Sequence, residues 1–437
     1  MNGAVGRLGT VTEDVVDELT WRGLLALSTD EQALRGALAE GPVTYYCGFD
    51  PTAPSLHFGN LLQLLTVRRL QDAGHRPLVL VGGSTGLIGD PKPEAERALN
   101  TKETVAEWVE RIRVQVSRYV AFEGDNAARV VNNLDWTAPL SAIDFLRDVG
   151  KHFRVNRMMA KEAVSARLES QEGISYTEFS YQLLQGLDFL ELYRRYGCIL
   201  QTGGSDQWGN LTSGVDLIHR VEGVSVHALA TPLLTKADGT KYGKTESGAI
   251  WLDPDMTSPY AFYQHWLNVE DSQVPVLLRA LSFRSRDEIE QIEQETAQRP
   301  AARVGQRVLA EELTTMVHGP DETARVVAAS RALFGQGALE ELDERTLSAA
   351  LSETSLARVP MGNDGPSYVD LFVAAALVPS RSAARRAIAE GGAYVNNARI
   401  DPSTDPDATV REDELLHGRW VVVRRGKRTV GGVEIVR

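Results

Sequence analysis

Two short segments, about 180 residues apart, contain side chains suited to binding a polyphosphate. The segment 51–60 lies between an apolar strand-like run and a helical run, and it contains His57 and Asn60. Both side chains are therefore predicted at a helix N-terminus, where free backbone N–H groups favour phosphate. The segment 241–245 has two lysines, a glycine and a hydroxyl group. This composition suits a loop that closes over a polyphosphate.

A glycine-rich turn at 82–86 admits two interpretations. Its sequence, Gly-Gly-Ser-Thr-Gly, fits the nucleophile elbow of serine hydrolases, with Ser84 as the nucleophile. The continuation at 87–91, Leu-Ile-Gly-Asp-Pro, favours a backbone wall around a small ligand instead, because the proline ends any immediate helix. The hydrolase interpretation also leaves the lysine-containing loop without a role.

A predicted helix at 174–189 carries three polar side chains on one face. Tyr181, Gln185 and Asp188 are spaced at i, i+4 and i+7. Leucine and phenylalanine make the rest of this helix apolar on nearly every side. Buried polar groups normally have hydrogen-bond partners, so we expect these three to meet a ligand or each other.

The elements that must position these residues alternate between strands and helices. This alternation predicts an α/β fold with a doubly wound, mostly parallel sheet. Ligands in such sheets gather at the carboxyl ends of the strands, where 51–60 and 82–86 both fall. The expected strands are 43–49, 78–81, 129–132, 199–202 and 224–229, and the expected helices include 61–73, 103–122 and 141–149.

Breaker residues divide the rest of the chain. The strand signal disappears after Ser258, and Gly-Pro and Gly-rich segments recur from Gly319 onward. We expect a catalytic Rossmann-like domain at 1–257, a helical domain at 258–318, a linker at 319–364 and a compact C-terminal domain at 365–437.

Composition excludes several classes of protein. With 43% hydrophobic and 24% charged residues among 437, the chain is an ordinary globular protein. No apolar stretch reaches membrane-spanning length, and residues 1–10 show no signal peptide, so we expect a cytoplasmic protein. Cys47 and Cys198 are expected as buried free thiols, and the scattered histidines indicate no protein-held zinc.

The charge of the chain is uneven. The net charge of −13 argues against a general nucleic-acid binder. Residues 365–437 nevertheless contain 11 Lys and Arg against 9 Asp and Glu, so the tail is slightly basic on an acidic body. This distribution indicates RNA contact confined to a patch.

Several segments taken in order resemble the bacterial tyrosyl-tRNA synthetases, a family of class I aminoacyl-tRNA synthetases. The family usually has His-x-Gly-His and Lys-Met-Ser-Lys-Ser where this chain has 57–60 and 241–245, so Asn60 stands in place of the second histidine. The likeness covers nearly the whole chain. It rests on 46–53, 86–91, 132–136, 181–188, 203–210 and 236–240.

The resemblance implies specific roles for residues of this chain. Tyr46 and Asp188 would meet the phenol hydroxyl of tyrosine, Asp90, Tyr181 and Gln185 its ammonium group, and Gln207 its carboxylate. Gly48, Asp50, Gly204 and Asp206 would bind ATP together with His57 and Lys244. Catalysis would fall to Thr52, His57, Asn60, Lys241, Lys244 and Thr245.

The same resemblance implies a reaction and its partners. The tyrosine carboxylate attacks ATP, which brings Mg²⁺ with it and needs no protein-held metal, and tRNA(Tyr) then receives the tyrosyl group. The enzyme would be a homodimer without membrane contact. A non-catalytic RNA-binding relative is the other alternative, although Lys241, Lys244 and His57 are all present.

The C-terminal domain resembles S4-type RNA-binding domains. A basic helix is predicted within 377–388, and a strand at 421–425 precedes a basic turn. The alternative for these charges is a solvated surface without RNA. The expected RNA-binding residues are Arg381, Arg385, Arg386, Arg424, Arg425 and Lys427.

Overall fold

The computed structural model describes most of the chain as two compact units. The first unit consists of residues 1–253 with 275–290, and the second of 254–274 with 291–437. At 162–163 and 244–245 the description is of the backbone alone. The described residues are 14–91, 99–171, 173–235, 239–240, 242–245, 248–362, 365–426 and 429–436.

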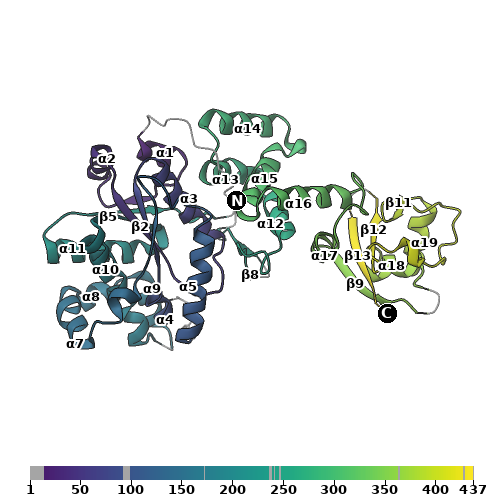
Figure 1. The fold of residues 1–437 in the computed structure, drawn as a ribbon. Helices are drawn as coiled ribbons and strands as arrows, with labels where there is room; N and C mark the ends of the chain where they lie inside the picture. The colour runs from purple at the N-terminus through teal and green to yellow at the C-terminus, as the bar shows by residue number, and fades with distance from the viewer. Residues whose placement is uncertain are drawn as a thin grey trace. The chain divides into compact units, whose positions relative to one another are not determined.

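The described part of the first unit is built around a six-stranded sheet (Figure 1). Its order is β1-β6-β5-β2-β3-β4, with β1 antiparallel to β6 and the other neighbouring pairs parallel. The prediction of a mostly parallel sheet is therefore confirmed. The strands are β1 (Leu27–Ser28), β2 (Thr44–Phe49), β3 (Arg76–Val81), β4 (Arg129–Asn132), β5 (Cys198–Gly204) and β6 (His227–Thr231).

The strand order creates a topological switch point between β2 and β5. From β2 the chain extends to β3 and β4, and it then returns to β5 and β6 on the other side of β2. Right-handed crossovers place the connecting helices of the two halves on opposite faces of such a sheet, which is the doubly wound arrangement. The central strands are buried on both faces, as Tyr45, Tyr46 and Phe49 of β2 show.

Two long helices of this unit begin and end at recognisable caps. In α3 (Phe58–Asp72) the N-cap is His57, and in α10 (Tyr176–Tyr196) it is Ser175, whose hydroxyl accepts the Glu178 N–H. Gly197 ends α10 in the left-handed conformation with φ 61°. The other helices include α1 (Val15–Trp21), α2 (Glu31–Glu40), α4 (Thr85–Ile88), α5 (Lys102–Val116), α6 (Leu134–Thr137), α7 (Ala142–Asp144), α8 (Val155–Met159), α9 (Glu162–Glu169), α11 (Trp208–Glu222) and α13 (Val274–Leu281).

The second unit combines helices with a five-stranded sheet of order β11-β10-β12-β13-β9. Its sheet strands are β9 (Ser355–Pro360), β10 (Ala393–Val395), β11 (Ala398–Arg399), β12 (Trp420–Arg425) and β13 (Thr429–Val436). Its helices include α12 (Pro259–Leu267), α15 (Val304–His318), α16 (Pro320–Leu333), α17 (Glu344–Ser352), α18 (Tyr368–Ala374) and α19 (Arg381–Ala389), and α14 (Arg286–Gln298) crosses the boundary between the units.

The segment expected as a linker has a different structure. It holds α16, α17 and β9, and β9 pairs in parallel with β13 over six residues. The strand β9 is therefore part of the C-terminal sheet and forms its edge beside β13. The helix expected at 103–122 also ends earlier, at Val116. Among the described residues, no helix is long and apolar enough to cross a membrane.

Candidate active site

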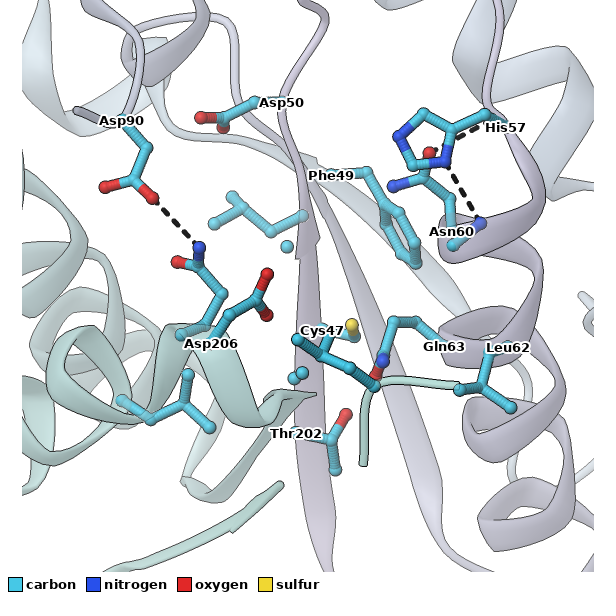
Figure 2. Close-up of a pocket in the computed structure, with 18 of the residues that line it drawn as sticks. Cys47, Phe49, Asp50, His57, Asn60, Leu62, Gln63, Asp90, Thr202 and Asp206 are labelled. Atoms are coloured by element: carbon cyan, nitrogen blue, oxygen red, sulfur yellow. Dashed lines mark hydrogen bonds between the residues drawn. The ribbon is translucent and has the colours of Figure 1, made fainter. Parts of the chain in front are cut away.

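A cavity of about 440 Å³ opens at the carboxyl ends of β2 and β5, at the switch point of the sheet. Figure 2 shows His57 and Asn60 on one side of it and Asp90 and Asp206 on the other. The structure thus brings together Tyr46 and Gln207, which are 161 positions apart in the sequence. The expected site residues that line the cavity are Tyr46, Gly48, Asp50, Thr52, His57, Asn60, Asp90, Tyr181, Gln185, Asp188, Gly204, Asp206 and Gln207.

Asp188 is held at the buried end of the cavity by two donors that sequence analysis did not single out. Trp136 Nε1 donates to Oδ1 at 2.8 Å, and Asn133 Nδ2 donates to Oδ2 at 3.0 Å. Burial raises the pKa of Asp188 to about 7, although both hydrogen bonds oppose the rise. The nearby Tyr46 hydroxyl is buried without a hydrogen-bond partner among the described residues. The carboxylate and the phenol thus form a polar end in an otherwise apolar part of the core.

Asp90 is oriented by two side chains of the segment that follows β5. Gln207 Nε2 donates to Asp90 Oδ2 at 2.9 Å, and Asn210 Nδ2 donates to Oδ1 at 3.1 Å (Figure 2 marks the first bond). Asn210 also donates to Gln207 Oε1 at 2.9 Å. Asn210 was not among the predicted site residues, yet its amide group holds both Asp90 and Gln207 in place.

Asp50 is bound by Tyr181 and Thr85. The Tyr181 hydroxyl donates to Asp50 Oδ2 at 2.6 Å, and Thr85 Oγ1 donates to Oδ1 at 2.6 Å. Tyr181 therefore contacts Asp50, a residue expected on the ATP side, as well as lining the cavity near Asp90. One turn further along α10, Gln185 Oε1 is buried without a partner among the described residues. Its carbonyl oxygen is suited to a ligand with N–H donors.

The first turn of α3 explains why an asparagine fits at position 60. His57 Nδ1 accepts the Gly59 N–H at 3.0 Å, and Asn60 Oδ1 accepts the His57 N–H at 3.0 Å (Figure 2). These two bonds form a reciprocal capping box. Since Nδ1 is an acceptor, a neutral His57 carries its ring proton on Nε2. Because Asn60 Oδ1 already accepts the His57 N–H, the NH2 group of Asn60 is the part of its side chain that can face the cavity.

The loop with two lysines is described only in part. Lys241 lies outside the described residues, and the backbone of Lys244 and Thr245 forms β7, which pairs with β8 (Gly248–Ala249). Gly243 lines the cavity with φ 81°, and an added Cβ would lie 2.8 Å from Phe58 Cδ1. Only glycine fits this close approach, which joins the loop to the first residue of α3.

The glycine turn after β3 packs against the segment that follows β2. A Cβ on Gly82 would lie 2.0 Å from Asp50 Oδ1, and one on Gly86 would lie 2.6 Å from Pro51 Cγ. The glycines are thus required for close packing at the cavity wall. Ser84 is not among the described residues that line the cavity, and its N–H is donated to Asn133 Oδ1 at 2.6 Å. The geometry supports the wall rather than the nucleophile elbow.

Cys47 lines the cavity but is not a candidate nucleophile. Burial raises the pKa of its thiol to about 12, so the thiol is neutral at physiological pH. The predicted burial of both cysteines as free thiols is confirmed. Among the described residues, no group of three or more His, Cys, Asp or Glu is arranged to hold a metal ion.

The predicted RNA-binding residues occupy two kinds of position in the C-terminal sheet domain. Arg381, Arg385, Arg386 and Arg425 are exposed. Arg424 differs from the prediction: it is only 8% exposed, and its guanidinium lies 4.2 Å from the Tyr394 ring centroid. Its burial and its contact with the Tyr394 ring give it a packing role. Lys427 lies outside the described residues.

Two of the three exposed arginines of α19 are partly neutralised by aspartates. Arg381 contacts Asp370, and its Nη2 lies 3.1 Å from Asp407 Oδ1. Arg385 Nη2 lies 2.9 Å from Asp407 Oδ2. Such exposed pairs are weak and readily exchange partners, so these guanidinium groups remain available to phosphate.

Comparisons with known proteins agree with this geometry. Residues 38–335 match the family described as tRNA synthetases class I (W and Y), and residues 352–430 match the tyrosine–tRNA ligase SYY-like C-terminal domain. The second match begins before β9, as the pairing of β9 with β13 requires.

Individual relatives match nearly the full chain. The tyrosine–tRNA ligase of Streptomyces avermitilis is 68% identical over 423 residues, which cover 97% of this chain and 99% of the relative. That of Streptomyces coelicolor is 67% identical with the same coverage. A C-terminally truncated mitochondrial tyrosyl-tRNA synthetase from Aspergillus nidulans has a similar structure, with a TM-score of 0.66 at 29% identity over 74% of this chain and 94% of that chain. The chain therefore belongs to the class I tRNA synthetases (W and Y), and within them to the tyrosine–tRNA ligases.

Proposed function

We propose that the cavity at the switch point holds L-tyrosine and ATP side by side, so that they form tyrosyl adenylate and pyrophosphate. The tyrosyl group then passes to the 3′-terminal adenosine of tRNA(Tyr). This assignment rests on the buried polar end of the cavity. The Asp188 carboxylate lies there near the Tyr46 hydroxyl, which has no hydrogen-bond partner among the described residues. A phenol hydroxyl supplies one donor and one acceptor, which both groups can use.

The ammonium group of tyrosine would bind further along α10. Gln185 Oε1 is a buried acceptor without a described partner, and the Asp90 carboxylate is oriented toward the cavity by Gln207 and Asn210. A buried unpaired polar atom costs about 1–3 kcal/mol, which an ammonium donor would recover. Tyr181 completes this site, and Gln207 would lie near the tyrosine carboxylate.

ATP would bind between the first turn of α3 and the end of β5. Gly48, Gly204 and Asp206 would approach the ribose, and Asp50 would also lie on the ATP side. The proposed groups for the α- to γ-phosphates are Thr52, His57, Asn60, Lys241, Lys244 and Thr245. Mg²⁺ prefers phosphate oxygens and few protein ligands, so it would enter with the nucleotide.

In this assignment the substrates react with each other. The tyrosine carboxylate attacks the α-phosphorus, and the bond from that phosphorus to the bridging oxygen breaks as pyrophosphate leaves. The protein contributes the alignment of the two reactants and donors for the charge that moves onto pyrophosphate. Tyrosine-dependent exchange of labelled pyrophosphate into ATP tests this function directly. Activity that survives Ser84→Ala excludes the hydrolase alternative.

Lys244→Ala should slow adenylate formation by roughly two orders of magnitude and change tyrosine affinity less than about twofold. Removal of one preorganised donor from a developing charge typically has an effect of this size. Rapid-quench measurement of adenylate formation, with tyrosine binding at equilibrium, separates the two quantities. Lys102→Ala, on the exposed start of α5, is the matched control. An unchanged formation rate would contradict the role of Lys244.

We also propose a homodimer whose contact includes the segment 143–176. Soluble monomers rarely expose a large contiguous apolar surface. We propose that a second copy of the chain, which presents the same side chains, covers this exposed apolar surface. The large apolar side chains exposed in this segment are Ile143, Leu146, Val155, Met159, Leu168 and Tyr176.

Tyr176→Glu should shift the protein from dimer to monomer. Its side chain is 68% exposed, and a charge there would be buried without a partner on association. Sedimentation velocity over a range of concentrations measures this change. Val114→Glu, which places the same charge at a 53% exposed position of α5, should leave the oligomeric state unchanged. A dimer that persists in Tyr176→Glu would place the contact elsewhere.

The C-terminal sheet domain is the proposed contact for tRNA. Arg381, Arg385, Arg386 and Arg425 present exposed guanidinium groups that can pair with phosphate. We further propose that activation belongs to the N-terminal catalytic domain and that the enzyme works in the cytoplasm.

A further inference from the structure

Behind Asp90 lies a polar network that the proposed chemistry does not use. Lys161 Nζ donates to the Gly209 carbonyl oxygen and, at 2.9 Å, to Ser213 Oγ. Gln182 Nε2 donates to the same hydroxyl at 2.8 Å, and Ser213 Oγ donates to the Gly209 carbonyl at 2.7 Å. The hydroxyl therefore accepts two hydrogen bonds and donates one, which uses all of its capacity.

The network joins three helices at points next to proposed substrate residues. Lys161 is the N-cap of α9, Gln182 is on α10, and Gly209 and Ser213 are on α11. In α10, Gln182 directly follows the cavity-lining Tyr181. In α11, Gly209 lies between the two side chains that hold Asp90, so its carbonyl is part of the turn that aims them.

The lysine is closely fitted to this turn. A Cβ on Gly209 would lie 3.1 Å from Lys161 Cε and 3.2 Å from its Cδ and Nζ. Burial lowers the pKa of Lys161 to about 7, while Asp90 and Asp216 act in the opposite direction. A neutral amine keeps two N–H groups, so both hydrogen bonds persist whether or not Lys161 is protonated.

We propose that Lys161 is a positioning residue for the amino-acid site, because it fixes the first turn of α11 from behind and thereby aims Gln207 and Asn210 at Asp90. The inference rests on the proposed role of Asp90 toward the tyrosine ammonium group. Lys161 acts through the backbone of Gly209 and does not contact tyrosine itself.

A direct contact with RNA is the competing role for Lys161. The lysine also lines a cavity of about 180 Å³ beside α8 and α11, which has a basic rim. RNA binding would affect tRNA charging and leave activation without RNA intact. The charged or titratable residues that line this cavity with Lys161 are His152, Arg154, Arg157, Asp216 and Arg220.

The test uses the full chain and pyrophosphate exchange without tRNA. Lys161→Met should raise KM for tyrosine about tenfold and leave KM for ATP and kcat within about twofold of the native values. Without the lysine, only the side chains that bind the tyrosine ammonium group lose their alignment. Lys151→Met, at an exposed lysine of the same segment, should change none of these constants. Asp90→Asn should raise KM for tyrosine in parallel.

A second variant separates positioning from general destabilisation. Gly209→Ala keeps the lysine but should displace it, so KM for tyrosine should rise several-fold when Gly209→Ala is made alone. When Gly209→Ala is added to Lys161→Met, KM for tyrosine should not rise further than in Lys161→Met itself. Additive effects would overturn the inference, as would an unchanged KM in Lys161→Met while Asp90→Asn raises it. If Lys161→Met fails to fold, an unchanged KM in Gly209→Ala overturns the inference. If Asp90→Asn itself has no effect, the ammonium assignment fails instead.

Discussion

Replacing Asp188 with asparagine should lower kcat/KM for tyrosine by roughly one to two orders of magnitude. The same substitution should change kcat/KM for phenylalanine by less than about threefold. A hydrogen bond to a charged group contributes about 1.5–3 kcal/mol, and its loss falls only on a substrate with a phenol hydroxyl. Phenylalanine makes no such bond in either protein. The ratio of the two constants is therefore the diagnostic quantity.

The surroundings of Asp188 indicate that the substitution also destabilises the free protein although it is isosteric, an effect that is the same for both amino acids and cancels in the ratio of the two constants. Both carboxylate oxygens already accept hydrogen bonds, from Trp136 and Asn133. An asparagine would turn its NH2 toward one of these donors, and two donors would then face each other in a buried site. Asn133 cannot easily reverse its amide, because its Oδ1 accepts the Ser84 N–H at 2.6 Å.

Pyrophosphate exchange with each amino acid measures both constants. Asp135→Asn is the matched control, because it removes the same charge at an exposed position next to Trp136. Equal losses with tyrosine and phenylalanine would remove Asp188 from the hydroxyl site. A loss confined to tyrosine would support its pairing with Tyr46.

The parts of the site that lie on one element could be predicted from sequence. The spacing of Tyr181, Gln185 and Asp188 placed them on one face of α10, and all three line the cavity. The placement of 51–60 and 82–86 at the carboxyl ends of strands also followed from pattern, because buried parallel strands are recognised as apolar runs and ligands bind at their carboxyl ends.

Partners brought together by the fold could not be predicted in the same way. Asn133 and Trp136 are 55 and 52 positions from Asp188 in sequence, and no local spacing links them. Tyr181 similarly binds Asp50, which is 131 positions away. Periodicity determines which face a side chain occupies, but the geometry of crossing elements determines what it meets.

Arg424 and Arg425 are adjacent in β12 but differ in burial. The residues of β12 are buried as far as Arg424, and exposure begins only at the last residue of the strand. Arg425 is the exposed one, and Arg424 lies over Tyr394. Counting clustered charges treats both as surface groups, and nothing in that count marks Arg424 as the cross-strand neighbour of Tyr394.

The pairing of β9, which lies before the boundary expected at 365, was not visible from sequence for a different reason. The strand β9 follows α17 closely, ends in Pro360 and is followed by Gly362, so its local sequence resembles a connecting segment. Its partner β13 lies about 75 residues later, and their parallel pairing is a long-range contact. Such a pairing becomes visible only when the sheet has been assembled.

This boundary leads to a prediction about two truncations. Removal of 353–437 should leave pyrophosphate exchange within about twofold and reduce charging of tRNA(Tyr) on the order of a hundredfold, because the exposed arginines that would contact phosphate are lost. Removal of 365–437 should give the same loss of charging but a less soluble protein. It leaves β9 without β13, as an unpaired strand edge.

Aminoacylation, pyrophosphate exchange and light scattering of both proteins distinguish these outcomes. The longer deletion retains α17, which contacts α12 and α16 of the helical region and so keeps part of its packing. Full charging by either truncated protein would show that tRNA recognition resides in the remaining chain. Loss of pyrophosphate exchange with intact melting behaviour would instead mean that the C-terminal sheet domain supports activation, since the described residues that line the cavity all lie between 46 and 249.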